Sequence, residues 1–305
     1  MSIKRFLDYK SPVYKLFLHI GIIFPDWLYV NIQYFFYFGK FPNLKSPITF
    51  NEKLQWLKLY NRRPMYTTLV DKIEVKKWVK KILGEKYVIP TYGVWTHPRE
   101  IEFEKLPKEY VIKCNHSGGN CGIHIVKDGA NVDTQLIKKN LSKALRHSIY
   151  KYFREWPYKN VKKRILAEKY LGENISDYKF FCYDGFVESV MVCTDRESGH
   201  PKFYFFDEKW NLKRYNIRGK NAAPDFTLPP PKNIEKMFEI ASILSKGFPF
   251  VRVDLYNIDG RIYFGEITFY PASGLDNNLL LETDILFGNY IKLPLNENNR
   301  IRSKS

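Results

Sequence analysis

The sequence predicts an α+β fold, and two observations lead to this class. Strand-like runs are gathered in groups with helical patterns between them, which differs from the regular alternation of strand and helix in a doubly wound sheet. The composition is that of a globular protein, since 45% of the 305 residues are hydrophobic and 17% are aromatic. A chain of this length buries a large core and fits one large or two modest domains.

The first part of the chain has mostly helical periodicity, up to about residue 60. Residues 49–52, Thr-Phe-Asn-Glu, resemble a helix-capping sequence, and apolar residues recur after them. A basic amphipathic pattern over 66–83 predicts one further helix, which Gly84 ends.

Strand patterns dominate the rest of the chain. The runs 110–114 and 122–126 predict a hairpin with two glycines at its tip, and 132–152 predicts a helix. Four strands are expected next, at 164–170, 177–183, 186–193 and 202–206. An amphipathic helix over 234–245 then leads to a last hairpin over 252–268.

The segment 14–38 is apolar and aromatic, but Lys15, His19, Pro25 and Asp26 interrupt it too often for a membrane-spanning helix. Two interpretations stay open: two packed helices that separate at Pro25, or an apolar patch that lies on a membrane surface. Four cysteines without a secretory signal predict a reducing compartment. We therefore expect a cytoplasmic protein, with the inner face of the cytoplasmic membrane as a second location.

The charge is strongly basic. Forty-nine Lys and Arg against 32 Asp and Glu give a net charge of +17, which favours a polyanion, a phosphorylated ligand or an anionic membrane surface as partner. No zinc-finger spacing, homeodomain-like helix or RNA-binding aromatic motif occurs, so we expect no nucleic-acid partner.

The last hairpin carries Asp254 in its first strand and Glu266 in its second. A two-residue loop of Asp259 and Gly260 sets these carboxylates on opposite faces, whereas a three-residue loop with a bulge at Gly260 sets them on one face. The second register gives one face of Arg252, Asp254, Glu266 and Thr268, and an apolar face of Val251, Val253, Leu255, Tyr263 and Ile267. We favour it because the apolar set suits a core.

Two carboxylates on one strand face predict a site for a hard cation such as Mg²⁺, which binds a few carboxylates together with phosphate oxygens. The alternative is structural: an ion pair between Arg252 and Asp254, with Glu266 exposed to solvent.

The segment 113–121 reads Lys-Cys-Asn-His-Ser-Gly-Gly-Asn-Cys. Adjacent glycines let backbone N–H groups approach an anion, and Lys113 adds a charge, which is phosphate-site chemistry without the ending of a Walker A loop. The weaker alternative is a zinc site made of Cys114, His116, Cys121 and His124. Its spacing departs from that of zinc fingers.

The order of the motifs resembles that of the ATP-grasp superfamily. The motifs are Asp71-Lys72, the strand ending at Lys113 with its glycine hairpin, Ala-Glu-Lys-Tyr-Leu at 167–171, Asp-Tyr-Lys-Phe-Phe-Cys-Tyr-Asp-Gly at 177–185, and Arg252-x-Asp254 followed by Glu266. Within the superfamily, the stretches 50–64, 154–162 and 246–274 resemble the teichuronopeptide-biosynthesis (TupA-like) branch. The likeness runs from about Thr49 to Gly274.

This resemblance implies a division of the chain. A helical N-terminal segment would cover 1–65, an ATP-grasp domain 66–295 and a basic tail 296–305. Within the domain, a nucleotide-clasping lobe of about 85–170 and a metal-binding lobe of about 171–290 would hold ATP between two α+β lobes.

The resemblance also implies roles for single residues. The nucleotide-binding set would be Lys72, Lys113, Ser117, Gly118, Gly119, Glu168, Lys169, Tyr170, Leu171 and Glu173. In this set the lysines at 72 and 113 contact phosphates, 117–119 closes over them, 168–171 faces adenine and Glu173 reaches the ribose. Asp254 and Glu266 would hold Mg²⁺, while Lys179 contacts a phosphate and Arg252 steadies the reacting acid. Thr268 departs from the pattern, because many members have Asn there.

The activity implied is that of an ATP- and Mg²⁺-dependent carboxylate–amine ligase acting through an acylphosphate, in the synthesis of a cell-surface polysaccharide such as a capsule, an O-antigen or a teichuronopeptide-like polymer. Its partners would be a small carboxylic acid and an amine or glycan precursor. Two alternatives stay open: a glycosyltransferase of polysaccharide synthesis, and an ATP-binding protein that has lost catalysis.

Overall fold

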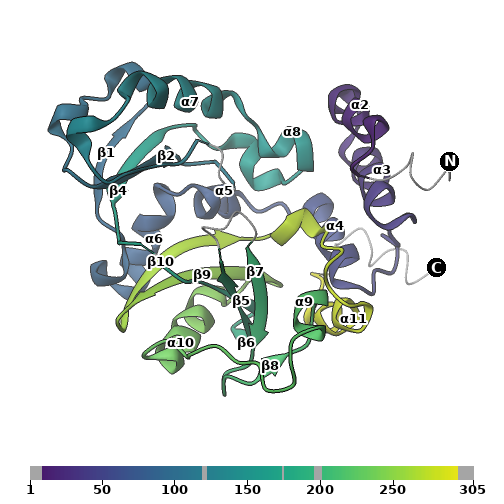
Figure 1. Ribbon diagram of the computed structural model, residues 1–305. Coiled ribbons are helices and arrows are strands. Elements are labelled where there is room, and N and C mark those ends of the chain that lie inside the picture. Colours follow the sequence, from purple (N-terminus) through teal and green to yellow (C-terminus); the bar gives the residue numbers. More distant parts are fainter. Residues whose placement is uncertain (1–8, 119–121, 174, 196–200, 295–305) are drawn as a thin grey trace.

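The computed structural model describes residues 9–118, 122–173, 175–195 and 201–294. Two antiparallel sheets lie one above the other in Figure 1, and helices cover their outer faces. Helices and antiparallel sheets thus form separate layers, which confirms the predicted α+β class.

The smaller sheet has the strand order β1-β4-β2-β3. Its strands are β1 (Thr91–Trp95), β2 (Tyr110–Cys114), β3 (His124–Val126) and β4 (Ile165–Lys169). Tyr110, Ile112 and Cys114 alternate along β2 and are buried in a core shared with helix α7 (Thr134–Arg146). Lys113, between them in the sequence, therefore lies on the opposite face of this sheet.

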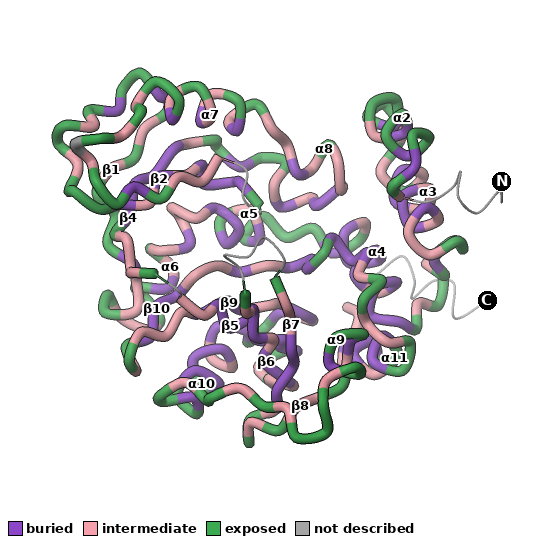
Figure 2. The backbone as a smooth tube through the Cα atoms, viewed as in Figure 1, coloured by how far each residue is buried: buried purple, intermediate pink, exposed green. Residues whose placement is uncertain are grey.

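The larger sheet has the strand order β10-β9-β5-β6-β7-β8. Its strands are β5 (Asp177–Tyr183), β6 (Phe186–Thr194), β7 (Lys202–Phe206), β8 (Leu212–Lys213), β9 (Val251–Ile258) and β10 (Arg261–Thr268). Helix α10 (Ile234–Ser245) packs against its lower face in Figure 1 and buries the main apolar core, drawn purple in Figure 2.

The N-terminal part is helical as predicted. Helices α2 (Pro12–Ile20) and α3 (Asp26–Phe38) separate at Pro25, with a short 3₁₀ turn, η1 (Gly21–Ile23), between them. They share a small aromatic core, and no helix of the described residues is long and apolar enough to span a membrane. Helix α4 (Phe50–Tyr60) joins this pair to the body and begins with the predicted capping box, in which Thr49 and Glu52 bond each other's backbone N–H.

Two predicted helices are each broken in the structure. The pattern over 66–83 forms α5 (Pro64–Val70) and α6 (Glu74–Leu83), because the Asp71 side chain accepts bonds from the backbone N–H groups of residues 73 and 74 and starts a new helix. The pattern over 132–152 forms α7 and α8 (Ile149–Phe153), since Ser148 caps the second. The remaining helices are α9 (Ile217–Lys220) and α11 (Leu281–Tyr290).

Candidate active site

The hairpin of β9 and β10 places the carboxylates by a route other than the one predicted. Asp259 and Gly260 form a two-residue turn with φ of 51° and 93°, so the predicted three-residue loop is wrong. An extra residue, Gly265, interrupts the ladder instead, and beyond it Glu266 lies opposite Asp254. The bulge therefore puts both carboxylates on one face.

The bulge also determines which other side chains lie on each face of the β9–β10 hairpin. Arg252 and Thr268 are opposite each other and share the carboxylate face, as expected. Tyr263 lies opposite Tyr256 and so belongs to the carboxylate face, which corrects its predicted place on the apolar face. Phe264 takes that place in the core.

Arg252 and Asp254 form the ion pair of the structural alternative. The Arg252 guanidinium donates from Nε to Asp254 Oδ1 at 2.6 Å and from Nη2 to Oδ2 at 2.7 Å. Lys179, on β5, contacts Asp254 Oδ2 at 2.7 Å and Asp177 Oδ2 at 2.5 Å. Burial lowers the pKa of Lys179, but the Asp254 carboxylate raises it above its ordinary value, so the lysine stays charged.

Glu266 belongs to the same cluster and is only partly exposed. Its Oε1 accepts from Arg252 Nη2 at 3.2 Å and from the Thr268 hydroxyl at 3.3 Å, and its Oε2 lies 3.1 Å from Lys72 Nζ. Burial raises the pKa of Glu266, but Lys72 and Arg252 hold it well below its ordinary range. Asp254 and Glu266 thus have two cationic partners each.

Lys72 joins the two sheets. It lies in the turn between α5 and α6, and its backbone N–H donates to the Asn115 carbonyl at 3.1 Å. Its Nζ donates to the Ser117 carbonyl at 2.9 Å while it contacts Glu266. The helix break at Asp71 therefore positions a lysine between the glycine loop and the β9–β10 hairpin.

A second ion-pair group lies on the inner face of the smaller sheet. Glu168, on β4, is ion-paired through Oε1 with Lys113 of β2 and through Oε2 with Lys76 of α6, the latter at 2.9 Å. Burial raises the pKa of Glu168, but the two ammonium groups lower it to about 2. The two lysines therefore favour the ionised form of this carboxylate.

The glycine loop begins at a rigid base. Asn115 is fully buried, and its side chain accepts from the Arg164 backbone N–H at 2.8 Å and donates to the Lys162 carbonyl at 2.9 Å. Ser117 is buried and Gly118 is exposed, so the chain reaches the surface at the loop. Gly119, the last predicted residue of the tip, lies outside the described residues.

The segment after β4 connects the two sheets. Lys169 is exposed and pairs through its backbone N–H with the Pro90 carbonyl at 2.9 Å, while Tyr170 and Leu171 are half-buried. Glu173 is exposed and ion-paired with Lys127. The predicted hinge set is thus contiguous with Glu168 in the connection from β4 to β5.

The donor set fits Mg²⁺ under one condition. Within the described ranges no three His, Cys, Asp or Glu side chains are grouped in a way that would hold a metal ion. Mg²⁺ is commonly held by one or two carboxylates together with substrate phosphates and water. Asp254 and Glu266 therefore fit a metal ion that arrives with phosphate oxygens.

Three ionic residues of these clusters escaped the sequence analysis. Asp177 is ion-paired with Lys179. Its position two residues before Lys179 in a predicted strand puts both side chains on one face, and this spacing was a usable signal. Lys76 shares Glu168 with Lys113 and follows Lys72 by one helical turn. Glu155 is buried, and the charge of Arg252 acts to lower its pKa. Nothing in the local sequence pattern indicates that these two residues are neighbours.

Two sheets that face each other across clusters of lysines and carboxylates define an ATP-grasp fold. Residues 52–292 match the family model described as TupA-like ATPgrasp, and the chain belongs to this family. No curated protein matches the sequence.

Solved structures similar to the chain include three ligases. A D-alanine–D-alanine ligase from Bacillus anthracis is 17% identical, with 79% of this chain and 71% of that chain covered and a TM-score of 0.42. The Helicobacter pylori enzyme of that name is 16% identical, with 80% and 69% covered and a TM-score of 0.40. An L-amino acid ligase from Bacillus licheniformis is 13% identical, with 82% and 57% covered and a TM-score of 0.43.

Proposed function

We propose that the protein is an ATP- and Mg²⁺-dependent carboxylate–amine ligase that acts through an acylphosphate in the synthesis of a cell-surface polysaccharide. The observation that carries this proposal is the cluster in which Arg252 is shared by Asp254 and Glu266, with Lys72 and Lys179 on its two sides. The cluster brings paired carboxylates and several cations to one place, as phosphoryl transfer requires.

The cations act by screening phosphate charge. Lys72, Lys113 and Lys179 each contact a carboxylate in the protein, and each would exchange it for a phosphate oxygen of ATP. Asp254 and Glu266 would then hold Mg²⁺ with Arg252 as their remaining cationic partner, and the ion would screen the charge that develops on the transferred phosphoryl group. Ligand exchange of this kind leaves no buried charge without a partner.

The nucleoside would lie against the smaller sheet. Glu168 and the following residues to Leu171 form the connection between the sheets, where adenine would bind. Ser117, Gly118 and Gly119 would close over the phosphates, since the Ser117 carbonyl, just beyond the end of β2, already accepts a bond from Lys72 Nζ. Glu173 would reach the ribose after leaving Lys127.

The proposed reaction consists of two successive nucleophilic substitutions. A carboxylate oxygen of the acid attacks the γ-phosphorus of ATP, the bond to the bridging oxygen breaks, and ADP leaves. The amine nitrogen then attacks the acyl carbon, the carbon–oxygen bond to phosphate breaks, and the amine proton is carried away with the leaving phosphate. Arg252 would steady the acylphosphate, because its planar fork suits anionic oxygens.

The test is ADP release by the purified protein with ATP and Mg²⁺, against uronic acids and amino acids paired with a panel of amines. We expect ADP only when an acid is present, and a new amide mass when a suitable amine is added. Release of UDP or GDP from nucleotide sugars without ATP consumption would establish a glycosyltransferase in its place. ATP binding with no turnover on any pair would indicate lost catalysis.

The N-terminal helices support contact with an anionic membrane surface. Apolar side chains of α2, η1 and the start of α3 are exposed, with Leu16 at 60% and Ile23 at 85%. The exposed set is Val13, Leu16, Ile20, Ile22, Ile23 and Trp27. Four lysines, Lys10, Lys15, Lys40 and Lys45, occur in the same part of the sequence. An exposed apolar stripe with a Trp and flanking lysines is typical of helices that lie in the interface of an anionic bilayer.

A further inference from the structure

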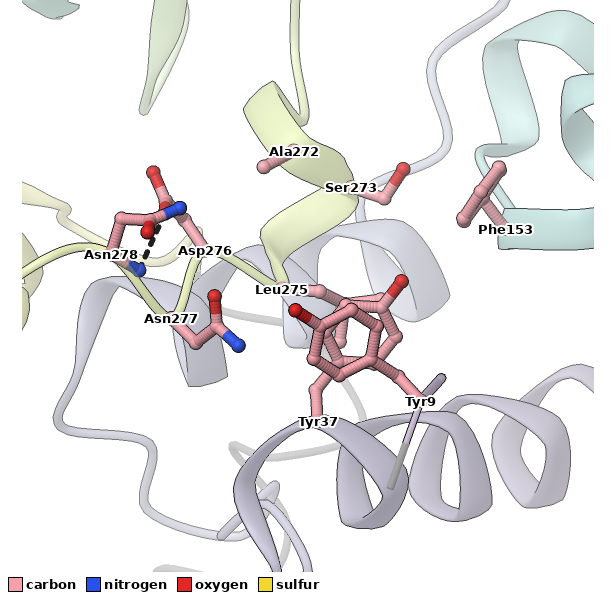
Figure 3. Close-up of a pocket in the computed structure, with 9 residues that line it drawn as sticks. All are labelled: Tyr9, Tyr37, Phe153, Ala272, Ser273, Leu275, Asp276, Asn277 and Asn278. Atoms are coloured by element: carbon pink, nitrogen blue, oxygen red, sulfur yellow. Dashed lines mark hydrogen bonds between the residues drawn. The ribbon is translucent and has the colours of Figure 1, made fainter. Parts of the chain in front are cut away.

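A cavity of about 380 Å³ lies where the N-terminal helices meet the segment that follows β10. Figure 3 shows its lining, with the stacked rings of Tyr9 and Tyr37 on one side and the turn η8 (Pro271–Gly274) on the other. Thr268, which contacts Arg252, is four residues from Ala272 in this turn. An extended chain of that length spans at most about 14 Å, which limits the separation between this edge of the cavity and the residue that contacts Arg252.

The turn η8 is held in a costly conformation. Ala272 and Ser273 have φ of 47° and 56°, in the left-handed region that residues other than glycine rarely adopt. Gly274 follows at φ 63°, and a Cβ there would lie 2.7 Å from Gln55 Nε2. Backbone strain of this kind persists only where the surroundings impose it, and it is concentrated at functional sites.

One face of helix α4 holds the turn η8 in this strained conformation. Asn51, Gln55 and Lys58 follow one another at helical spacing, so they share a face, and all three are buried. Gln55 donates to the Ser273 and Gly274 carbonyls at 3.1 and 2.6 Å. Lys58 donates to the carbonyl of Phe153, another wall residue, at 3.0 Å.

The same face of helix α4 also bonds the far end of the cavity wall. Asn51 accepts from the backbone N–H of Asp276 at 2.9 Å and donates to its carbonyl at 3.2 Å. The wall from residue 273 to residue 276 is thus bonded to α4 at both ends, which keeps the cavity open and its shape fixed.

Glu155 connects the cavity to the catalytic cluster. The Ser273 hydroxyl donates to Glu155 Oε1 at 2.5 Å, and Glu155 lies within the electric field of Arg252 and Glu266. Burial raises the pKa of Glu155 to about 7, and the same cause lowers the pKa of Lys58 to about 7. Buried ionisable groups therefore lie between the cavity wall and the reacting groups.

The chemistry of the lining selects among ligands. Six side chains offer hydrogen-bonding groups: Tyr9, Tyr37, Ser273, Asp276, Asn277 and Asn278. Among the described lining residues there is one carboxylate and neither Lys nor Arg, although the chain has 49 basic residues. Such a surface repels a carboxylate or a phosphate and attracts an amine that also carries hydroxyl groups.

We propose that this cavity binds the amine substrate, a hydroxylated amine of the size and chemistry of an amino sugar, and presents its nitrogen to the acylphosphate beside Arg252. Asp276 holds the ammonium group until the ammonium releases a proton to water, and the Asn and Tyr side chains bond the hydroxyls. The assignment of the amine rests on the proposed ligase function, whereas binding to the cavity is measured without any turnover.

The test uses glucosamine as the probe, titrated into the full chain and followed by ligand-observed NMR, with glucuronate as a competitor. Asn277 is exposed on the cavity wall, so Asn277→Lys adds a cation without touching the core. Asp276→Asn removes the charge and keeps an acceptor for the Asn278 N–H. We expect each variant to weaken glucosamine binding about tenfold or more, the value of a charge-assisted hydrogen bond.

The matched control is Asn160→Lys, which adds the same charge at an exposed position outside the lining and should bind glucosamine as the wild type does. Glucuronate should not displace glucosamine. Equal binding by wild type and Asn277→Lys, displacement by glucuronate, or no binding of glucosamine would each overturn the assignment. If acid-dependent ADP release were observed together with any of these results, the proposed ligase function would be retained and only the assignment of this cavity as the amine site would be rejected.

Discussion

Asp254 lies directly opposite Glu266 across the β9–β10 ladder, and it does so only because Gly265 is an extra residue between Phe264 and Glu266. In a ladder without the bulge, Gly265 would lie opposite Asp254 and the period of two would turn Glu266 toward the core. Glycine suits this position, since a Cβ on residue 265 would lie 3.0 Å from the Asp254 carbonyl oxygen, closer than ordinary van der Waals contact. One backbone irregularity thus assembles the carboxylate pair.

Gly265→Ala should therefore disturb the carboxylate pair more than the fold. The new methyl group must push against the Asp254 backbone and the Tyr256 ring, 3.2 Å away, which costs about 1–3 kcal/mol of unfolding free energy. We expect ATP turnover to fall well beyond that loss. The measurement is ADP release beside urea unfolding, with Gly129→Ala as control because its Cβ would find its nearest atom at 3.4 Å. Unchanged turnover in Gly265→Ala would separate the bulge from the site.

Lys113 and Lys76 share the Glu168 carboxylate and give a matched pair of variants. Lys113→Met should weaken ATP binding about tenfold or more, because one charge-assisted contact to phosphate is lost. Lys76→Met removes the same charge from the same carboxylate but leaves the strand lysine in place, so ATP affinity should change little. Equal effects of the two substitutions would mean that Glu168 alone, and no direct phosphate contact, accounts for the role of Lys113.

The carboxylates should bind a metal ion only together with nucleotide. Asp254 and Glu266 are occupied by Arg252, Lys179 and Lys72, and a lone divalent cation would have to displace or approach these charges. We expect Mn²⁺, used as a paramagnetic substitute for Mg²⁺, to bind weakly alone and much more tightly in the presence of ADP or ATP. Stoichiometric tight binding of Mn²⁺ without nucleotide would contradict the exchange of lysines from carboxylate to phosphate.

The exposed stripe of α2 and η1 should anchor the protein to anionic vesicles. Flotation with phosphatidylglycerol-containing vesicles should recover the wild type, and recovery should fall on pure phosphatidylcholine or at high salt. Ile20→Ser with Ile23→Ser removes two apolar contacts worth about 1.5–3 kcal/mol each and should abolish flotation. Ile125→Ser, on β3, is the control, because Ile125 is exposed to 57%, close to the 51% of Ile20. Flotation of the double variant at the wild-type level would refute the membrane contact.

Local pattern was enough to predict several elements to the residue, among them the strand Asp177–Tyr183 and the helix Ile234–Ser245, because alternation and amphipathic periodicity are encoded in neighbouring residues. The shared face of Arg252 and Asp254 with Glu266 was also predicted, although by the wrong loop. An isolated glycine within a strand is a bulge signal, and Gly265 was that signal.

What local pattern does not contain is contact between distant segments. The Asp71 carboxylate at the helix break is also bonded at 3.0 Å by Arg164, from the far side of the glycine loop. The strained turn at Ala272 depends on the polar face of α4, where Asn51 and Gln55 look in the sequence like ordinary solvent-facing positions. Such residues are buried by partners that no local window includes.

Glu168 makes the stability of the protein depend on pH in a defined window. Its pKa is about 2 in the folded state against an ordinary value of 4.5, so its stabilising effect is complete above about pH 5 and is lost as the pH falls toward 2. The full effect is about 3 kcal/mol, and roughly half of it is lost by pH 3. Urea unfolding of wild type and Glu168→Gln between about pH 6 and about pH 3 should show that the difference in unfolding free energy becomes smaller as the pH falls. Glu173→Gln, which removes an exposed ion pair with Lys127, should show a small difference throughout. A pH-independent difference for Glu168→Gln would mean that the two lysines do not hold this carboxylate in its ionised form.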